Sequence, residues 1–181
     1  MSTMRVGHIE LLNWKNFQHV EANLTDRTFL IGPNASGKSN FLDAFRFLRD
    51  VAEKGLQVSV SKRGGLSAIR CLSARRRPEV VVDISLIDES GVRIWRYRLE
   101  LEQEKAGQHR CLVKVEEVWL NDESIFRGPA AQDMNDLDAR TETAMESFTV
   151  NKKFREVSEF LSSISYQHII PQVVRDPSGF S

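Results

Sequence analysis

One glycine-bounded stretch of eight residues constrains the fold of this chain more than any other feature. Residues 32–39 read GPNASGKS and match the pattern GxxxxGK[ST] at every specified position. Gly32 and Gly37 permit backbone angles and close approaches that a Cβ atom would block, so successive N–H groups can point at one anion. A short apolar segment, 28–31, precedes the stretch, and an amphipathic segment, 37–53, follows it. The sequence therefore predicts a strand buried in a parallel sheet, a phosphate-binding turn and a helix.

The residue types in this turn fit a nucleoside triphosphate with magnesium. The N-terminus of the following helix presents positive charge to phosphate oxygens. Lys38 supplies an ammonium group between the β- and γ-phosphates, and the Ser39 hydroxyl is a hard oxygen ligand of the kind that Mg²⁺ accepts. The expected nucleotide contacts are Asn34, Ala35, Ser36, Gly37, Lys38, Ser39 and Asn40, with Ser39 also a metal ligand.

Alternating and apolar runs predict a chain rich in strands around this turn. Expected strands are 5–12, 18–24, 28–31, 79–88, 92–102, 110–120, 124–126 and 166–170, and expected helices are 37–53 and 152–164. Short turns separate the strands between residues 79 and 126, which indicates an antiparallel meander. Segment 55–78 is expected to be irregular, and 128–147 to be a long loop or a frayed helix.

Composition limits the classes of function. The 181 residues carry 25 Lys and Arg against 25 Asp and Glu, but residues 1–78 sum to +7 and residues 79–181 to −7, which favours an anionic partner on the N-terminal side. No apolar run approaches the roughly 20 residues of a membrane helix, and no secretory signal is recognisable, so we expect a cytoplasmic protein without a membrane partner. Cys71 and Cys111 stand forty residues apart without CxxC spacing, which argues against a metal site.

The segment from residue 10 to 51 resembles the opening of ABC-type ATPase heads of the SMC/RecF-like group, AAA-family proteins found in DNA repair and phage defence. The connection WKNF and the turn GPNASGKSN both fit that group, although Ala35 stands where its members often carry Gly. The resemblance implies an α/β P-loop NTPase lobe with a mixed sheet, a P-loop helix and an antiparallel β subdomain, incomplete without a C-terminal lobe. Its expected parts are a P-loop core (1–54), a basic segment (55–78), an antiparallel β subdomain (79–127) and an acidic loop, helix and strand leading out of the lobe (128–181).

The same resemblance implies how such a lobe works. ATP and Mg²⁺ bind to the turn, and a second ATPase head or C-terminal lobe completes the site, with a homodimer expected for the full protein. Lys15 stands where related heads place a basic residue that reaches the nucleotide phosphates, although a solvated loop lysine is the alternative. The full system is expected to act on DNA, with a nuclease as a partner or as a further domain.

Hydrolysis also needs a carboxylate for Mg²⁺ and a group that orients water, and the chain has no convincing Walker B or signature motif, so the catalytic residues stay unassigned. The run ISLIDE at 84–89 resembles a Walker B strand, but a Ser-Gly turn follows at once. We therefore interpret Asp88 as part of a hairpin turn and expect Asp83 on the solvent face. Gln167 and Gln172 are weak candidates for the glutamine that such heads place near magnesium.

Segment 55–78 holds six cations and no acid. These side chains could meet the phosphates of DNA, and the salt dependence of binding would report such contacts. The other interpretation is a solvated loop that pairs with the acidic C-terminal half or with a partner subunit. The nucleic-acid candidates are Lys62, Arg63, Arg70, Arg75, Arg76 and Arg77.

Two other hypotheses stay open. A self-sufficient P-loop kinase or GTPase would use Asp83 or Asp88 as its magnesium carboxylate, which requires a parallel strand at 79–88 beside 28–31. A non-hydrolytic nucleotide-sensing module would bind the nucleotide without multiple turnover.

Overall fold

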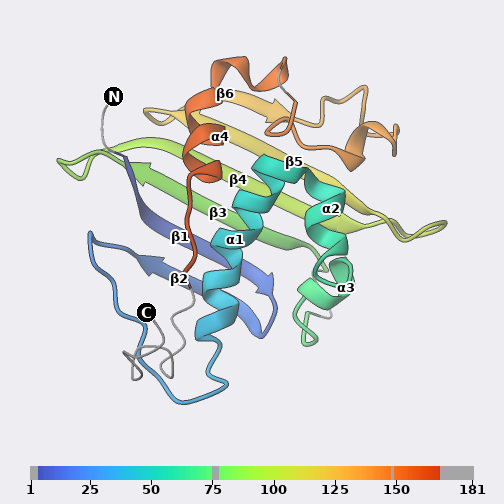
Figure 1. Cartoon of the computed structure of the whole chain (residues 1–181). Coiled ribbons are helices and arrows are strands. Elements are labelled where there is room, and N and C mark those ends of the chain that lie inside the picture. Colours follow the sequence, from blue (N-terminus) through green and yellow to red (C-terminus); the bar gives the residue numbers. More distant parts are fainter. Residues whose placement is uncertain (1–3, 75–77, 148, 168–181) are drawn as a thin grey trace, which may run out of the picture.

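A computed structural model of the chain describes residues 4–74, 78–147 and 149–167, and its centre is a six-stranded sheet. All neighbouring strands run antiparallel, in the order β2-β1-β3-β4-β5-β6 (Figure 1). Their bounds are β1 Arg5–Trp14, β2 Phe17–Asn23, β3 Val80–Ile87, β4 Arg93–Gln103, β5 Cys111–Leu120 and β6 Glu123–Gly128. The pairing of β3 with β1 joins the N-terminal hairpin and the expected meander into one sheet.

Helices cover one face of the sheet (Figure 1). They are α1 Lys38–Lys54, α2 Leu56–Ser61, α3 Leu66–Ile69 and α4 Arg155–Ser162, with 3₁₀ turns η1 Ala139–Thr141 and η2 Val150–Lys153. The apolar positions of α1 recur at helical spacing, and the helix ends where Gly55 takes a φ of 85°. The apolar stripe of α1 belongs to one core with the inner residues of the sheet, which include Phe41, Ala44, Phe47, Leu48 and Val51 of α1 and Ile9, Leu11, Val82, Ile84, Tyr97 and Leu99 of the strands.

The other face of the sheet is polar. Because Val82 and Ile84 belong to the core, Asp83 between them points to the opposite face. Its carboxylate accepts hydrogen bonds from Arg96 at 2.7 Å and from Arg98 at 3.2 Å, both on β4. Asp83 therefore forms cross-strand ion pairs with Arg96 and Arg98 on the sheet face that the helices leave uncovered.

Segment 28–31 is not a strand, contrary to the sequence prediction. Phe29 and Ile31 are 81% and 93% exposed. An apolar strand of this kind is buried only when neighbouring strands and covering layers surround it, and the described sheet has no parallel member to pair with it. The described sheet is thus antiparallel rather than mixed, whereas the α/β class, the P-loop helix and the antiparallel pairing of the predicted meander strands are confirmed.

Segment 55–78 is more ordered than its composition predicts. It contains α2 and α3, because apolar side chains at helical spacing reach the core from it. These buried residues are Leu56, Val60, Leu66 and Ile69. The described basic residues Lys62, Arg63 and Arg70 therefore lie on or directly after helices that pack against α1 and the sheet.

The C-terminal part follows the sequence prediction less closely. The expected helix at 152–164 is α4, preceded by the 3₁₀ turn η2, and the loop at 128–147 contains the 3₁₀ turn η1. Of the strand predicted at 166–170, residues 166 and 167 form no strand, and 168–170 lie outside the described residues.

Within the described ranges, no helix combines the length and apolarity needed to cross a membrane. Cys71 and Cys111 are buried free thiols. The same ranges contain no group of three or more His, Cys, Asp and Glu side chains that could hold a metal ion.

A buried carboxylate fixes the loop before α4 to the sheet. Glu116 of β5 accepts hydrogen bonds from the Tyr97 hydroxyl at 3.0 Å and from the backbone N–H groups of Ala144 at 2.6 Å and Met145 at 3.1 Å. Burial raises the pKa of Glu116 to about 7, although these hydrogen bonds favour its charged form. The loop is thus anchored by a group that titrates near neutral pH.

This anchor predicts a pH dependence of stability. Since the pKa of Glu116 is higher in the folded chain than in the unfolded one, its stabilising contribution is complete below pH 4.5 and is lost as the pH rises through about 7. The loss amounts to about 3 kcal/mol in the free energy of unfolding. Urea unfolding from about pH 5 to 8 should show a shallower decline for Glu116→Gln than for the unchanged protein. Parallel pH profiles for the two proteins would contradict this assignment.

Candidate nucleotide-binding site

The loop between segment 28–31 and α1 has the backbone of an anion-binding turn. Ala35 and Gly37 both take left-handed conformations, with φ of 63° and 99°. The Ser36 N–H donates to the Pro33 carbonyl at 3.3 Å, which closes a tight turn directly before α1. A left-handed φ is unfavourable for a residue with a Cβ atom, and this explains why glycine is common at the position of Ala35 in the group that the sequence resembles.

Lys38 folds back over this loop. Its Nζ donates to the carbonyl oxygens of Gly32 at 2.7 Å and Pro33 at 2.6 Å, and lies 3.4 Å from Ser36 Oγ. The ammonium group therefore lies within the turn, close to the loop that presents the N–H groups. A phosphate entering the turn would offer Nζ charged oxygens, which make stronger hydrogen bonds than neutral carbonyls. Ser39 is exposed in the first turn of α1, where its hydroxyl can ligate Mg²⁺.

The turn between β1 and β2 packs against the start of α1. Trp14 Nε1 donates to the Asn40 carbonyl at 2.7 Å, and Asn40 Nδ2 donates to Asn16 Oδ1 at 2.8 Å. A Cβ atom at Gly37 would lie 2.6 Å from Asn16 Nδ2 and 2.6 Å from the Phe17 ring. The hairpin turn and the glycine-rich loop therefore form one packed unit, in which only glycine fits at residue 37.

The sequence pattern drew attention to Lys15 in this hairpin turn but not to Asn16. Lys15 is half-buried and takes a left-handed conformation with a φ of 53°. The signal for Asn16 is weak, because an exposed asparagine in a turn is common and its partner, Asn40, lies 24 residues away.

A cleft of about 420 Å³ opens beside the glycine-rich loop. Both the loop and the exposed apolar segment contribute to its walls. The lining residues are Phe17, Phe29, Leu30, Ile31, Gly32, Pro33, Ser36, Gly37, Lys38 and Phe41. The glycine-rich loop and Lys38 therefore face an open space rather than a closed core.

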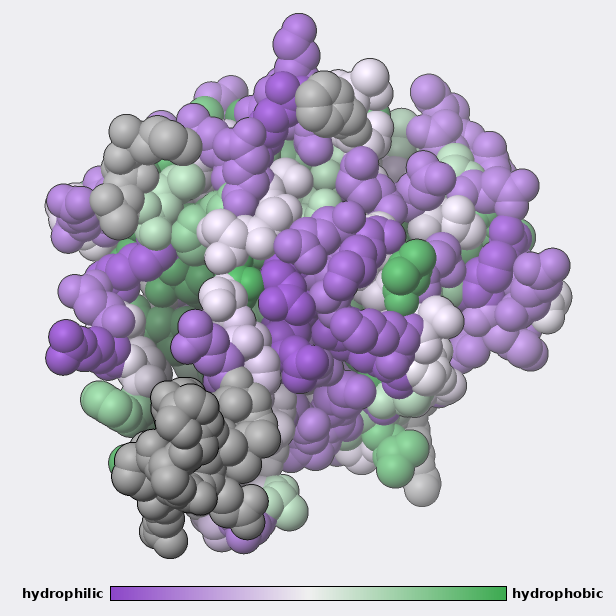
Figure 2. All heavy atoms as spheres, in the orientation of Figure 1, coloured by the Kyte–Doolittle hydropathy of each residue, from purple (hydrophilic) through white to green (hydrophobic). Residues whose placement is uncertain are grey.

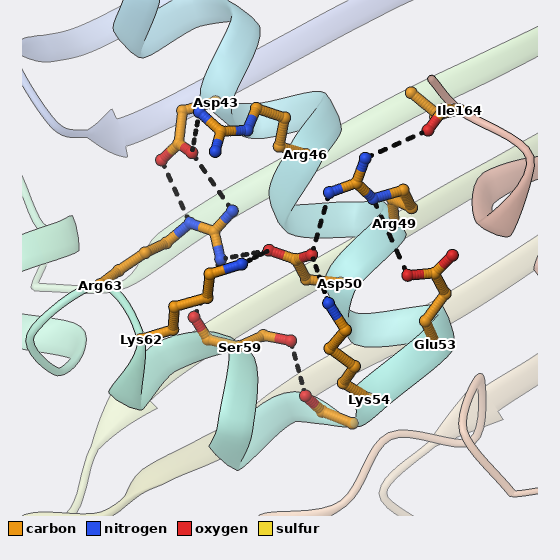
Figure 3. A network of polar contacts seen from close by, with 11 residues as sticks. Asp43, Arg46, Arg49, Asp50, Glu53, Lys54, Ser59, Lys62, Arg63 and Ile164 are labelled. Carbon is orange, nitrogen blue, oxygen red and sulfur yellow. Dashed lines mark hydrogen bonds and ion pairs between the residues drawn. The ribbon is translucent and has the colours of Figure 1, made fainter. Parts of the chain in front are cut away.

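A network of ion pairs joins the basic segment to α1 (Figure 3). Arg63 contacts Asp43 through two nitrogens, at 3.1 and 3.2 Å, and Asp50 through a third at 3.0 Å. The side chains of Arg63 and Asp50 are only 7% and 1% exposed. Arg63 is thus buried against the P-loop helix and does not contribute to a DNA-facing surface, and its acidic partners come from α1 rather than from the C-terminal half.

The charge of Asp50 is maintained by its neighbours. Burial disfavours the ionised form, but hydrogen bonds from Arg49 and Arg63 and the charge of Lys62 outweigh burial and hold the pKa of this carboxyl below its usual value. Asp43 and Asp50 stand seven residues apart on α1, so the sequence places them on one helix face. Figure 2 shows that the surface over α1 and α2 is mostly hydrophilic, which is consistent with a polar seam between these helices.

The remaining basic candidates have separate positions. Lys62 is 53% exposed and lies 3.8 Å from Asp50. Arg70 is half-buried, and its backbone forms an isolated bridge with Trp14, next to the hairpin turn. Arg75, Arg76 and Arg77 lie outside the described residues.

The acidic residues considered for magnesium are engaged elsewhere. Asp88 accepts hydrogen bonds from the Ser90 hydroxyl at 2.7 Å and the Val92 N–H at 2.9 Å, and so closes the β3–β4 turn. Asp83 lies on β3, which is antiparallel to both β1 and β4. This arrangement contradicts the parallel strand that a self-sufficient kinase or GTPase would require. Gln167 is exposed, and Gln172 lies outside the described residues.

Comparison with known families gives the class of the domain. A family model described as "AAA domain, putative AbiEii toxin, Type IV TA system" matches residues 27–175, which include the glycine-rich loop, α1 and the meander. The chain belongs to this family. Membership of the AAA family confirms that the chain is the lobe of an AAA ATPase, and thus an ATP-binding domain.

Of two further similarities, one covers a short segment of the chain and the other covers most of the chain at low sequence identity. Endonuclease GajA of Bacillus cereus (strain VD045) is 43% identical to this AAA domain over 47 residues, which are 26% of this chain and 8% of GajA. A solved chain from "Structural biochemistry of ATP-driven dimerization and DNA stimulated activation of SMC ATPases" is 19% identical, with a TM-score of 0.40 over 94% of this chain and 95% of that one. The AAA domain thus spans a small fraction of the curated relative that it matches.

Proposed function

We propose that this AAA domain is the ATP-binding lobe of an SMC/RecF-like ATPase head and that the loop at 32–39 is its phosphate site. The observation that carries the proposal is the loop itself, with its left-handed residues before α1 and the Lys38 ammonium held inside the turn. Phosphate oxygens would accept hydrogen bonds from backbone N–H groups of 34–39 and from Lys38 Nζ. Bound Mg²⁺ would neutralise charge on the phosphates, with Ser39 Oγ among its ligands.

The exposed apolar segment supports a second part of the proposal, a complementing C-terminal lobe. Leu30 lines a mostly apolar cavity of about 260 Å³ together with Phe41, Leu42 and Phe45 of α1. Contiguous apolar surface of this kind marks interaction sites in soluble domains. A strand of the complementing lobe that pairs with 28–31 would bury Phe29 and Ile31. The same lobe would supply the magnesium carboxylate, because Asp83 and Asp88 already have other partners.

In this proposal, ATP binding brings two heads together and hydrolysis releases them, so that the cycle controls action on DNA in genome maintenance or anti-phage defence. The name of GajA is that of an endonuclease, which supports a nuclease as a partner or further domain. Of the six cations of segment 55–78, Lys62 and Arg70 are described and could contact DNA, and Lys15 would reach the nucleotide phosphates from the hairpin turn.

Light scattering coupled to size-exclusion chromatography tests the head-association part. The head together with its complementing C-terminal lobe, with Mg²⁺ and a non-hydrolysable ATP analogue, should show about twice the mass that it shows with ADP. Lys38→Ala should keep the lower mass with either nucleotide, whereas the exposed control Lys105→Ala should behave like the unchanged protein. A constant mass in the presence of bound analogue would exclude ATP-driven association without affecting the assignment of the ATP site.

A further inference from the structure

The hairpin turn between β1 and β2 is attached to the start of α1 by a side-chain contact that strand pairing does not require. Asn16 Oδ1 accepts a hydrogen bond from Asn40 Nδ2 at 2.8 Å, and Trp14 Nε1 donates to the Asn40 carbonyl at 2.7 Å. Asn40 directly follows Ser39, the expected magnesium ligand. The two bonds therefore set the distance between the hairpin turn and the phosphate-binding end of α1.

The other side of the same turn is attached to the chain after α3. The Lys15 N–H donates to the Ile69 carbonyl at 2.6 Å, and the Cys71 N–H donates to the Asn13 carbonyl at 2.8 Å. Because both sides of the turn are held, its backbone has little freedom to move relative to α1. The Cα atoms of the turn, including that of Lys15, are therefore held at fixed positions relative to α1.

The backbone of Lys15 points to a role for its side chain. With a φ of 53°, Lys15 has a conformation that glycine and asparagine adopt more easily than lysine. Unfavourable backbone conformations that persist in a fold often mark functional positions. A lysine at this place, next to a loop that suits phosphate, adds a cation where an anion would bind.

We infer that Asn16 is a positioning residue, which holds Lys15 at the proposed ATP phosphates through its hydrogen bond to Asn40. Asn16 directly follows Lys15, and its amide is packed as closely against Gly37 as the Phe17 ring is, since a Cβ atom at Gly37 would lie 2.6 Å from each. Without the Asn16 side chain, the turn loses one of its two hydrogen bonds to Asn40, the one directly after Lys15, and Lys15 is held less firmly relative to the loop. This inference rests on the proposed function and names a determinant of affinity at the same site.

A double-mutant cycle separates this role from a general structural one. Mg²⁺-dependent binding of a fluorescent ATP analogue is measured for the protein, for Asn16→Ala, for Lys15→Asn and for the double variant. Lys15→Asn removes the cation but keeps a residue that accepts the left-handed conformation. Asn135→Ala, at an exposed asparagine in the loop after β6, serves as the control, and thermal melting is followed for every variant.

Asn16→Ala should weaken binding about fivefold, the loss expected when one hydrogen bond from Lys15 to a phosphate is no longer held in place, and should change binding less than twofold when Lys15→Asn is already present. Its melting temperature should stay close to that of the unchanged protein, because Asn16 is exposed. Equal losses in both backgrounds, or a fall in melting temperature without a loss of affinity, would overturn the positioning role. Failure of the unchanged protein to bind the analogue would instead reject the proposed function.

Discussion

Gly37→Ala is expected to abolish ATP binding at concentrations that saturate the unchanged protein and to lower the free energy of unfolding by about 2 kcal/mol. Gly37 has a φ of 99°, which L side chains rarely adopt. The added methyl group would also lie 2.6 Å from both Asn16 and the Phe17 ring. Relief of that overlap requires the hairpin turn to move from the loop, or the loop to change the direction of its N–H groups.

Gly91→Ala is the matched control for this change. Gly91 lies in the β3–β4 turn with a φ of 85°, but a Cβ atom there has no neighbour within 4 Å. Its substitution should therefore cost about 1 kcal/mol of backbone strain and leave ATP binding unchanged. Urea unfolding and equilibrium ATP titration measure both quantities. If Gly37→Ala behaves like Gly91→Ala in both, then the close packing of hairpin and loop is wrong.

Arg63→Ala should produce the second large effect, a loss of about 3 kcal/mol in the free energy of unfolding. The substitution removes both nitrogens that contact Asp43 and one that contacts Asp50, whose side chain is only 1% exposed. A buried carboxylate that loses a partner becomes costly, because water cannot replace the lost contacts. The guanidinium also packs over the Phe47 ring, 5.3 Å from its centre, and this contact is lost as well.

Arg93→Ala provides the comparison for an exposed pair. Arg93 contacts Asp122 on the surface, with exposed fractions of 44% and 69%, so its loss should cost less than about 1 kcal/mol. Arg63→Lys should fall between the two, since an ammonium group cannot bind Asp43 through a planar pair of donors. Thermal or urea unfolding gives all three values. A loss for Arg63→Ala no larger than that for Arg93→Ala would show that the network at α1 does not stabilise the fold.

The sequence correctly predicted the elements whose patterns depend only on residues that are close together in the chain. The glycine-rich loop was recognisable because its spacing, the preceding apolar residues and the following helical stripe all agreed. The meander after Glu79 was predictable because alternation and short turns specify antiparallel strands without information from distant residues.

The remaining features depend on partners that are far apart in the sequence. Segment 28–31 has the composition of a buried strand, yet it is exposed, because burial requires strands that the described sheet does not contain. Arg63 belonged to a run of cations and carried no sign that its partners, Asp43 and Asp50, would come from α1. The bond between Asn16 and Asn40 was equally invisible, since it joins two ordinary polar residues from different elements.

Calorimetric titration of the protein with ATP in the presence of Mg²⁺ tests the central claim most directly. The account predicts one saturable site per chain, and Lys38→Ala should weaken binding at least about tenfold, because the lost hydrogen bonds to phosphate are charge-assisted. The exposed control Lys105→Ala should bind like the unchanged protein. Equal affinities for the unchanged protein and Lys38→Ala, or no binding by the unchanged protein, would contradict the assignment of an ATP site to this loop.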